Sequence, residues 1–364
     1  MLQGFKQSVK DLFNPGAGNL LWSGQFWSRR RRLPWRESRV VTHVKPAEKA
    51  VEKIDTLLVC VKAQSTLATI RGLLPRLSAN STIVLLQNGM GVYDELVREL
   101  FPDPQQRPHI VHAVITHGAW IKNYMHVVHA GVGKIDIGIM PDGQGRDFEI
   151  SYHKPGPLDF LSQPRLHLKD IMSGAGDLAL GRYRTLHDTV GAMLRMNALQ
   201  VSWLPIYDIQ MAMRQKVVVN AVINPLTALL DCKNGKLMEH RHARNLCRAI
   251  CWEAEVVFRA QWEHERRDTD DMSTFPIVLQ TKHLEHLCFS VASATANNIS
   301  SMLADVRLRR PTEIEYMTGY LIRLGRKYGV RTRTNLALYN IIRMRTALDV
   351  ESSDTSFTPR SSTM

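Results

Sequence analysis

The chain lacks several features that would point to a particular class of protein. It has no apolar run of about 18 residues or more and no apolar signal-peptide core near its start, so we expect neither a membrane span nor secretion. Its five cysteines include no C-x-x-C pair, which favours a reducing compartment, the cytoplasm or alternatively the mitochondrion. Cys247 and Cys251, one helical turn apart, are predicted to be core thiols. His240 and His242 share no helix face and have no carboxylate set nearby, so no metal site is predicted.

Acidic residues are few relative to basic ones. The chain has 34 Asp and Glu against 47 Lys and Arg, a formal net charge of +13. A basic surface of this kind attracts an anionic cofactor and an anionic substrate. The alternative partner is a nucleic acid, for which Arg29–Arg32 with Trp27 and Trp35 form the one basic cluster. Because no base- or RNA-recognition motif accompanies that cluster, we do not expect nucleic-acid binding.

The first half of the chain alternates short apolar runs with amphipathic segments. Strands are predicted at 54–62, 81–86, 109–116 and 124–139, and helices at 65–77, with Ser65 as N-cap, and at 92–100. This order is typical of an α/β fold, with a Rossmann-like, doubly wound parallel sheet over residues 1–204. Residues 141–182, rich in Gly, Pro and charge, are predicted to be a surface insertion.

From Pro205 the pattern becomes helical. Helical periodicity recurs near 206–231, 238–264, 276–296, 311–328 and 334–347, with no convincing strand between these segments. Residues 205–348 are therefore predicted to form a second, all-α domain, which would hold the substrate and the catalytic groups. Residues 349–364 are rich in Ser and Thr and are predicted to be a disordered tail.

The first of these helical segments carries an unusual polar stripe. Lys216, Asn220 and Asn224 recur every four residues and would stand on one helix face within an otherwise apolar segment. A single lysine there is most simply explained by its ammonium group reaching out to solvent. Three aligned polar groups favour a polar ligand, because amides and an ammonium in apolar surroundings need hydrogen-bonding partners.

Other polar residues lie at the ends of apolar runs. Lys62 follows the run from Thr56 to Val61, and Asn88 follows the run from Thr82 to Leu86 and precedes Gly89. In doubly wound sheets, ligands bind beyond the carboxyl ends of the strands, where both residues are expected. Further along, Pro311 with Thr312 and Glu313 suits the opening turn of a helix.

Together and in order, these motifs resemble the ketopantoate reductase (2-dehydropantoate 2-reductase) family. The resemblance covers residues 55 to 345 and is more specific for the family than for the substrate. The matching pieces are Val61-Lys62-Ala63, Gln87-Asn88-Gly89-Met90-Gly91, Thr116-His117-Gly118-Ala119, Lys216 to Ala228, Asn234-Gly235, Asn298 with Ser300-Ser301-Met302, and Thr312-Glu313-Ile314-Glu315.

The resemblance implies NADPH-dependent reduction of 2-dehydropantoate to pantoate in pantothenate and coenzyme A biosynthesis, or of a close 2-keto acid. It implies that Lys216 donates the proton, and that Glu313 lies where cofactor and substrate meet. It further implies a small-molecule 2-keto acid as partner, and a homodimer as the assembly. The substrate-binding residues would be Asn220, Asn224, Asn234, Asn298 and Ser301. The cofactor-binding residues would be Lys62, Asn88, the backbone at Ala119, and Glu313.

Several of these residues have simpler structural interpretations. Lys62 would be a strand-end lysine in solvent, Ser301 a helix N-cap, and Glu313 a residue of a first helical turn. His112 and His117 are interpreted as hydrogen-bonded sheet histidines.

The glycine fingerprint of dinucleotide-binding folds is incomplete in this sequence. The nearest match is Gly16-Ala17-Gly18-Asn19-Leu20-Leu21, where Leu21 replaces the third glycine and no strand precedes the motif. Residues 1–50 are therefore atypical, the first βαβ unit is predicted to be truncated or rewritten, and NADPH binding is predicted to be weak or absent. These features favour an alternative function. In this alternative, the chain is a non-catalytic relative of the family that acts as a binding or regulatory protein, associates with RNA and is located in the mitochondrion. The set of Lys216 and its polar neighbours favours the enzyme.

Overall fold

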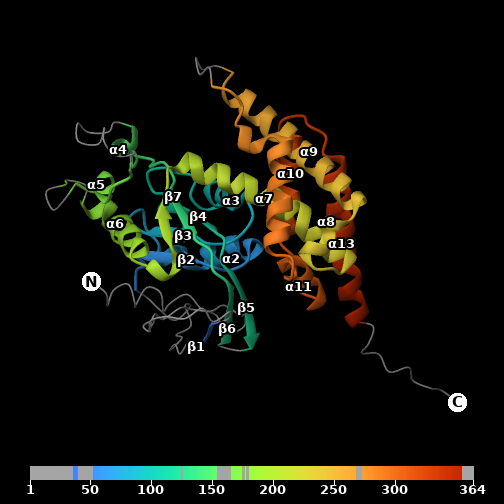
Figure 1. The fold of residues 1–364 in the computed structure, drawn as a ribbon. Coiled ribbons are helices and arrows are strands. Elements are labelled where there is room, and N and C mark those ends of the chain that lie inside the picture. The colour runs from blue at the N-terminus through green and yellow to red at the C-terminus, as the bar shows by residue number, and fades with distance from the viewer. Residues whose placement is uncertain are drawn as a thin grey trace. The chain divides into compact units, whose positions relative to one another are not determined.

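The computed structural model describes residues 36–39, 52–123, 126–153, 165–173, 177, 180–267 and 273–354 (Figure 1). The glycine motif at 16–21 and the arginine cluster at 29–32 lie outside these ranges. The chain divides into two compact units. We call residues 1–87 with 93–210 the sheet unit, and residues 88–92 with 211–364 the helical unit. Among the described residues, none of the helices has both the length and the hydropathy that a membrane span requires.

The sheet unit contains a five-stranded sheet with the order β2-β3-β4-β7-β8 (Figure 1). Strands β2, β3 and β4 are parallel, β7 is antiparallel to β4, and β8 is parallel to β7. Parallel strands covered on both faces consist of near-continuous apolar runs, as these do. The bounds are β2 Thr56–Val59, β3 Thr82–Leu85, β4 His109–Ile115, β7 Ile135–Ile139 and β8 Val201–Trp203.

Helices connect these strands and pack against the sheet. Helix α2 (Ala63–Leu73) and the 3-10 turn η2 (Leu74–Arg76) follow β2, and α3 (Val92–Glu99) follows the loop after β3. Helix α6 (Leu180–Leu194) contributes Leu186 and Val190 to the core around Val84, Val111 and Ile137. The N-cap of α2 is Lys62 rather than the predicted Ser65, so this helix begins at Ala63, shortly after β2 ends at Val59.

A second sheet of three antiparallel strands has the order β1-β6-β5. Its strands are β1 Arg36–Arg39, β5 Gly118–Asn123 and β6 His126–Gly131. The single strand predicted at 124–139 is wrong, because the chain breaks into β6 and β7 at residues 132–134. Gly133 lies against the backbone of Thr116 and His117, where any side chain would collide, so the turn between the two strands requires glycine.

The segment predicted to be a surface insertion contributes to the core. Its described part contains α4 (Ile150–His153) and α5 (Leu168–Ile171). Phe148 and Ile171 are buried in the same core as residues of the strands. Arg146 forms a bidentate salt bridge with Asp177. Because Gly, Pro and charged residues separate the few buried apolar positions in this segment, no apolar periodicity in the sequence predicts that they belong to the core. The 3-10 turn η4 (Asn197–Leu199) precedes β8.

The helical unit contains no strand among its described residues, as predicted. Its core consists of apolar side chains from seven helices, among them Val222, Ile250, Leu284, Leu321 and Ile342, which lie at 0% exposure. The helix bounds are α7 Ile206–Leu230, which begins in the sheet unit, α8 Asn234–Glu239, α9 Arg241–Glu265, α10 Thr281–Ala294, α11 Ser301–Arg307, α12 Thr318–Lys327 and α13 Arg333–Asp354, with 3-10 turns η5 Ile277–Leu279 and η6 Ile314–Tyr316.

The start of one helix and the end of another in this unit differ from the prediction. The helix expected from residue 311 begins at Thr318, and Glu313 is instead the N-cap of η6, so it does not lie in a first α-helical turn. Helix α13 continues to Asp354, past residue 348, because extending an existing helix adds a backbone hydrogen bond for each residue fixed. Helices α8 and α11 are too short for a hydrophobic periodicity to be recognised in the sequence.

Candidate active site

The predicted polar stripe lies on helix α7, with Lys216, Asn220 and Asn224 one turn apart along it. The neighbouring positions Val217, Val218, Ala221 and Val222 are buried in the helical core. Asn224 is also buried, at 6% exposure, while Lys216 and Asn220 are half-buried. Helix α7 therefore carries an ammonium group and two amides on a segment that is otherwise apolar and packed in the core.

The Lys216 ammonium is coupled to the Glu313 carboxylate. Burial lowers the pKa of Lys216 to about 8, because water no longer solvates the charged form, and the negative charge of Glu313 opposes that shift. Glu313 is itself buried, at 8% exposure, directly before the turn η6. The fold thus brings together two groups about 100 residues apart in sequence, one acid and one base.

Two contacts hold the stripe of α7 against the loops around Glu313 and Ser301. The amide nitrogen of Asn224 donates to the sulfur of Met317 at 3.4 Å, and the Thr227 hydroxyl donates to Ser300 Oγ at 2.8 Å. Ser300 Oγ also accepts from the backbone N–H of Leu303, which makes Ser300 the N-cap of α11. The interpretation of Ser301 as the cap is therefore wrong by one residue. Ser301 is the exposed first residue of that helix.

Asn234 and Asn298 are brought together by a backbone hydrogen bond. The N–H of Asn234 donates to the Asn298 carbonyl at 3.0 Å, and the Asn234 amide nitrogen donates to Thr295 Oγ1 at 2.9 Å. The Asn234 side-chain oxygen is buried and accepts no hydrogen bond from the described residues. Asn298 has an exposed side chain. Asn234 thus holds a fixed amide whose oxygen can accept a hydrogen bond from a ligand.

The loop 88–92 packs on the turn that follows Glu313. Gly89 has φ +89°, and a Cβ there would lie 2.7 Å from both Cβ and the carbonyl oxygen of Tyr316. The N–H of Met90 donates to the same Tyr316 carbonyl at 2.8 Å. Only glycine permits both the positive φ and this close approach. Asn88, the first residue of the loop, is therefore held near the polypeptide segment that carries Glu313.

The remaining predicted residues lie in the sheet unit. Lys62 is half-buried at the carboxyl end of β2, and Ala119 is an exposed residue of β5 that pairs with His129 across a β-bulge. Gln87, which the prediction did not select, donates from Nε2 to Thr66 Oγ1 at 2.8 Å. Its Oε1 is buried and accepts no hydrogen bond within the described chain. Its position next to Asn88 was the only sequence signal for it.

The two sheet histidines differ in their partners. His117 accepts from the Gly133 N–H at 3.0 Å, and its other ring nitrogen lies 3.0 Å from the Leu199 carbonyl, as expected for a hydrogen-bonded histidine. Burial lowers the pKa of His112 to about 4, and its ring packs edge-on against Tyr93. Neither ring is a predicted catalyst.

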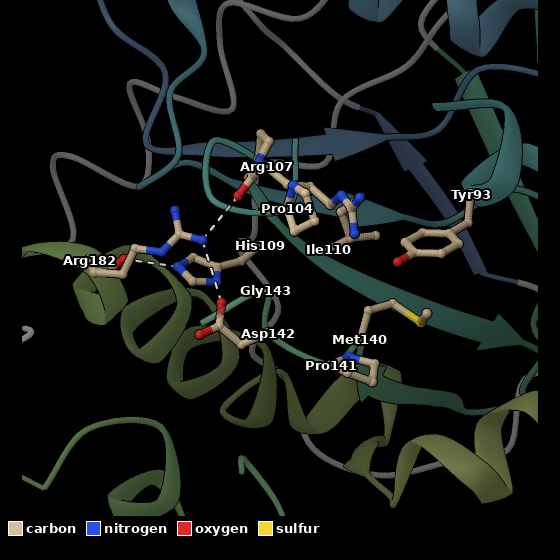
Figure 2. Close-up of a pocket in the computed structure, with 11 residues that line it drawn as sticks. Tyr93, Pro104, Arg107, His109, Ile110, Met140, Pro141, Asp142, Gly143 and Arg182 are labelled. Atoms are coloured by element: carbon tan, nitrogen blue, oxygen red, sulfur yellow. Dashed lines mark hydrogen bonds and ion pairs between the residues drawn. The ribbon is translucent and has the colours of Figure 1, made fainter. Parts of the chain in front are cut away.

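A pocket in the sheet unit contains none of the predicted site residues (Figure 2). Arg182 lies in it and donates to the carbonyls of Ala79 and Arg107 and to the Asp142 carboxylate. His109 is bonded to the Arg182 carbonyl at 2.9 Å. Arg182, Asp142 and His109 are thus joined by hydrogen bonds, and we assign the pocket a structural role.

Comparison with known proteins decides the family. Residues 29–142 match the family model described as ketopantoate reductase PanE/ApbA, and residues 208–346 match the model of the C terminal part of the same family. The two matches cover more than half of the chain. The chain belongs to the ketopantoate reductase family. It is thus an oxidoreductase of the ketopantoate reductase type, and both the family resemblance and the predicted fold class are confirmed.

Curated members of the family align over most of their length. The 2-dehydropantoate 2-reductase of Salmonella typhimurium is 31% identical over 80% of this chain and 75% of its own. That of Vibrio cholerae is 29% identical over 79% and 77%. A probable 2-dehydropantoate 2-reductase of Schizosaccharomyces pombe is 26% identical over 85% of this chain and 79% of its own.

Solved structures share the fold at lower identity. A PanE/ApbA family ketopantoate reductase from Ralstonia eutropha superposes with a TM-score of 0.60 at 18% identity, covering 84% of this chain and 80% of that one. A D-mandelate dehydrogenase, in a ternary structure with NADH and anilino(oxo)acetate, superposes with a TM-score of 0.59 at 16% identity, covering 85% and 82%. A sheet domain followed by a helical domain is thus common to this chain and to both solved proteins.

Proposed function

We propose that this protein reduces 2-dehydropantoate to pantoate, or a close 2-keto acid to its 2-hydroxy acid, with NADPH as the reductant. Such an enzyme serves pantothenate and coenzyme A biosynthesis. The observation that carries the proposal is the coupling of Lys216 to Glu313, with the buried amide of Asn224 on the same helix as Lys216. The names of the curated relatives support the substrate class.

Lys216 has the properties that the proton donor needs. Reduction of a ketone leaves negative charge on its oxygen, which a nearby ammonium group both stabilises and protonates. A pKa of about 8 leaves Lys216 mostly protonated at neutral pH and makes it a stronger acid than an ordinary lysine. Glu313 keeps the proton on Lys216 until it is transferred, because its negative charge favours the ammonium form.

The amides and Ser301 are assigned to the substrate. Asn220, Asn224 and Asn234 are neutral donors and acceptors, which orient hydroxyl and carbonyl oxygens without adding charge. Asn234 offers the clearest case, because Asn234 Oδ1 is buried without a partner in the described chain. Asn298 and Ser301, both exposed, are assigned to the carboxylate end of the substrate.

We assign the predicted cofactor-binding residues to the nicotinamide half of a dinucleotide. Gln87 Oε1 is a buried acceptor without a protein donor among them, suited to a carboxamide or ribose hydroxyl, and Asn88 lies on the glycine loop that follows. Lys62 and the backbone at Ala119 complete the assignment, with Glu313 where cofactor and substrate would meet. When bound, the reduced nicotinamide supplies the hydride. The diphosphate half belongs to the fingerprint region, outside the described residues.

The proposal is tested by following NADPH oxidation with 2-dehydropantoate, an aliphatic 2-keto acid and an aromatic 2-keto acid. We expect turnover with 2-dehydropantoate and less with the aromatic compound. NADH in place of NADPH tests the cofactor assignment, since one structural neighbour was solved with NADH. No oxidation with any 2-keto acid, in a protein shown to be folded, would contradict the proposal.

A cofactor titration separates the enzyme from the non-catalytic alternative. The incomplete motif at 16–21 predicts weak NADPH binding, measured by fluorescence. Turnover at saturating NADPH supports a reductase with a weakened cofactor site. Absence of turnover together with salt-sensitive binding of RNA would favour the alternative, because phosphate contacts weaken as salt rises.

Two further assignments accompany the proposal. We place the protein in the cytoplasm, in line with its unpaired cysteines. We assign it a homodimeric state, since one structural neighbour is described as a dimeric ketopantoate reductase from Staphylococcus aureus, at TM-score 0.56 and 19% identity. Light scattering of the purified chain decides between a monomer and a dimer.

A further inference from the structure

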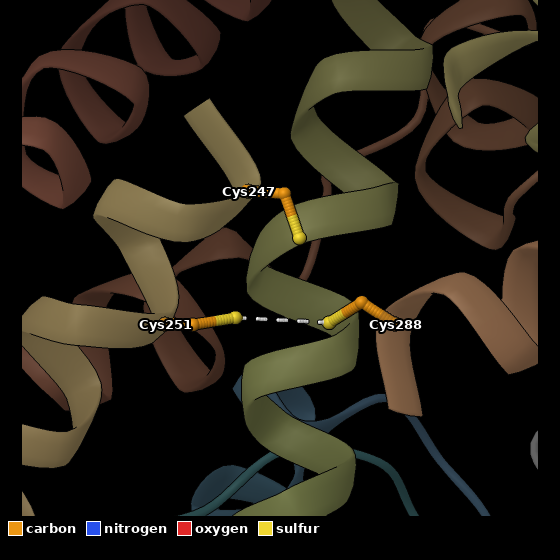
Figure 3. A group of neighbouring side chains, drawn as sticks. All are labelled: Cys247, Cys251 and Cys288. Carbon is orange, nitrogen blue, oxygen red and sulfur yellow. Dashed lines mark hydrogen bonds between the residues drawn. The ribbon is translucent and has the colours of Figure 1, made fainter. Parts of the chain in front are cut away.

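Three cysteine thiols converge inside the helical unit, and none of them is among the residues assigned to catalysis (Figure 3). Cys247 and Cys251 lie one turn apart on α9, and Cys288 faces them from α10. All three sulfur atoms lie within 4.8 Å of one another, and those of Cys251 and Cys288 are 3.9 Å apart. Each residue is fully buried, at 0% exposure.

Burial alone does not explain the arrangement. A free cysteine often packs as a small hydrophobic residue, and one or two of them in a core would need no further account. Here three sulfurs from two helices point to one spot (Figure 3). A disulfide requires sulfurs about 2 Å apart, far closer than these. All three are free thiols.

The separation suits a metal ion in the plane of three sulfurs. Metal–thiolate bonds are about 2.3 Å long, so three sulfurs placed evenly around one ion lie about 4 Å apart. The Cys251–Cys288 distance of 3.9 Å matches that spacing, so small side-chain adjustments would suffice. Ile250, Ala254 and Leu284 are fully buried members of the same core, so the surroundings are apolar.

We propose that Cys247, Cys251 and Cys288 form a three-thiolate site for a soft, thiophilic metal ion, with Cu(I) as the ion that fits it best. Soft thiolate ligands select Cu(I) and zinc among common metals. Structural zinc requires four ligands, and among the described residues this group offers three ligand atoms from His, Cys, Asp or Glu. Three-fold coordination therefore favours Cu(I).

Each cysteine binds a metal ion as its thiolate. Binding of Cu(I) therefore displaces the thiol protons to solvent, so metal affinity falls as pH falls. A bound ion would also cross-link α9 to α10.

Copper content and coordination test the site. The full chain is produced in copper-supplemented medium under reducing conditions, and its copper is measured by elemental analysis and X-ray absorption. We expect about one copper per chain with three sulfur neighbours. The matched control is Cys232→Ala, which removes a cysteine of the same unit outside the group and should keep the copper.

Single variants Cys247→Ala, Cys251→Ala and Cys288→Ala should each weaken Cu(I) binding by about 100-fold or more, since even residues behind the ligands change affinity about 10- to 100-fold. Circular dichroism checks that each variant folds. Should all three unfold, the sulfur count of the unsubstituted chain still decides. Negligible copper in that chain, copper retained by folded variants, or preferential four-coordinate zinc would each overturn the proposal. Catalytic turnover does not enter these measurements.

Discussion

Two groups of buried polar side chains, one in each unit, differ in the hydrogen bonds that they form. In the sheet unit, Arg182 donates to two backbone carbonyls and to Asp142, and the same carboxylate accepts the Tyr183 hydroxyl at 2.6 Å. In the helical unit, Asn224 donates to a sulfur, a weak acceptor, and the buried oxygen of Asn234 lacks a donor among the described residues. Polar groups that the protein satisfies hold the fold, and those that it leaves under-used are where a ligand gains most.

The same contrast exists within the helical unit. Glu253 is buried at 4% exposure and accepts from the N–H groups of Thr334 and Asn335 and from the Asn335 amide, at 2.7, 3.0 and 2.8 Å. Glu253 therefore accepts hydrogen bonds from N–H groups at the start of α13, and its role is structural. Burial lowers the pKa of Lys216, which lies on another helix of the same unit. Substitutions at these positions should therefore affect stability in one case and chemistry in the other.

The largest expected effect is on turnover. Lys216→Ala should lower turnover by about two to four orders of magnitude, the usual loss when a positioned acid is removed. NADPH affinity should change little, and the protein should remain folded. Lys236→Ala, at an exposed lysine of α8, is the control and should retain full turnover. Normal turnover of the Lys216 variant would show that another group donates the proton.

Next in size is a loss of stability. Glu253→Ala leaves the buried Asn335 amide and two helix N–H groups without their acceptor, which should cost roughly 3 kcal/mol of unfolding free energy. Urea denaturation measures the loss. The same substitution at exposed Glu263, on the same helix, should stay within about 0.5 kcal/mol. If the two variants have the same unfolding free energy, the hydrogen bonds of Glu253 contribute little to stability.

A smaller effect concerns acid stability of the sheet unit. The pKa of His112 falls from 6.5 to about 4 on folding, so the unfolded chain binds an extra proton between these values. Stability from neutral His112 is present above pH 6.5 and is lost as pH falls toward 4, at up to about 1.4 kcal/mol per pH unit. His112→Phe should reduce that slope. His283→Phe, at an exposed position, should leave it unchanged. Denaturation midpoints across this window provide the measurement.

The smallest expected change is a shift in a pH profile. Glu313 raises the pKa of Lys216 against the larger effect of burial. Turnover that needs the ammonium form should decline as pH rises past about 8, and Glu313→Gln should move that decline to lower pH. Glu263→Gln serves as the matched exposed control. A decline that stays in place would mean that Glu313 does not act on Lys216.

Local pattern accounts for what the sequence predicted. The β-branched runs around Leu57, Ile83 and Val111 are continuous enough to identify β2, β3 and β4, and the four-residue spacing on α7 identifies Lys216 and its amides. The misses depend on contacts between distant segments. Strand β8 is three residues long, and Ser300, the N-cap of α11, also accepts a hydrogen bond from Thr227, 73 residues away. Likewise, nothing in the periodicity shows that Cys288 meets Cys251.

The loop after β3 sets a limit on how this protein can be divided. Residues 88–92 precede α3 in the chain, yet they belong to the helical unit through Gly89, Met90 and their contacts with Tyr316. A fragment that starts at residue 211 would lose this insert and expose the surface on which Met90 packs. Exchange of domains between relatives would therefore have to transfer the loop together with the helices, because the helical unit is discontinuous in sequence.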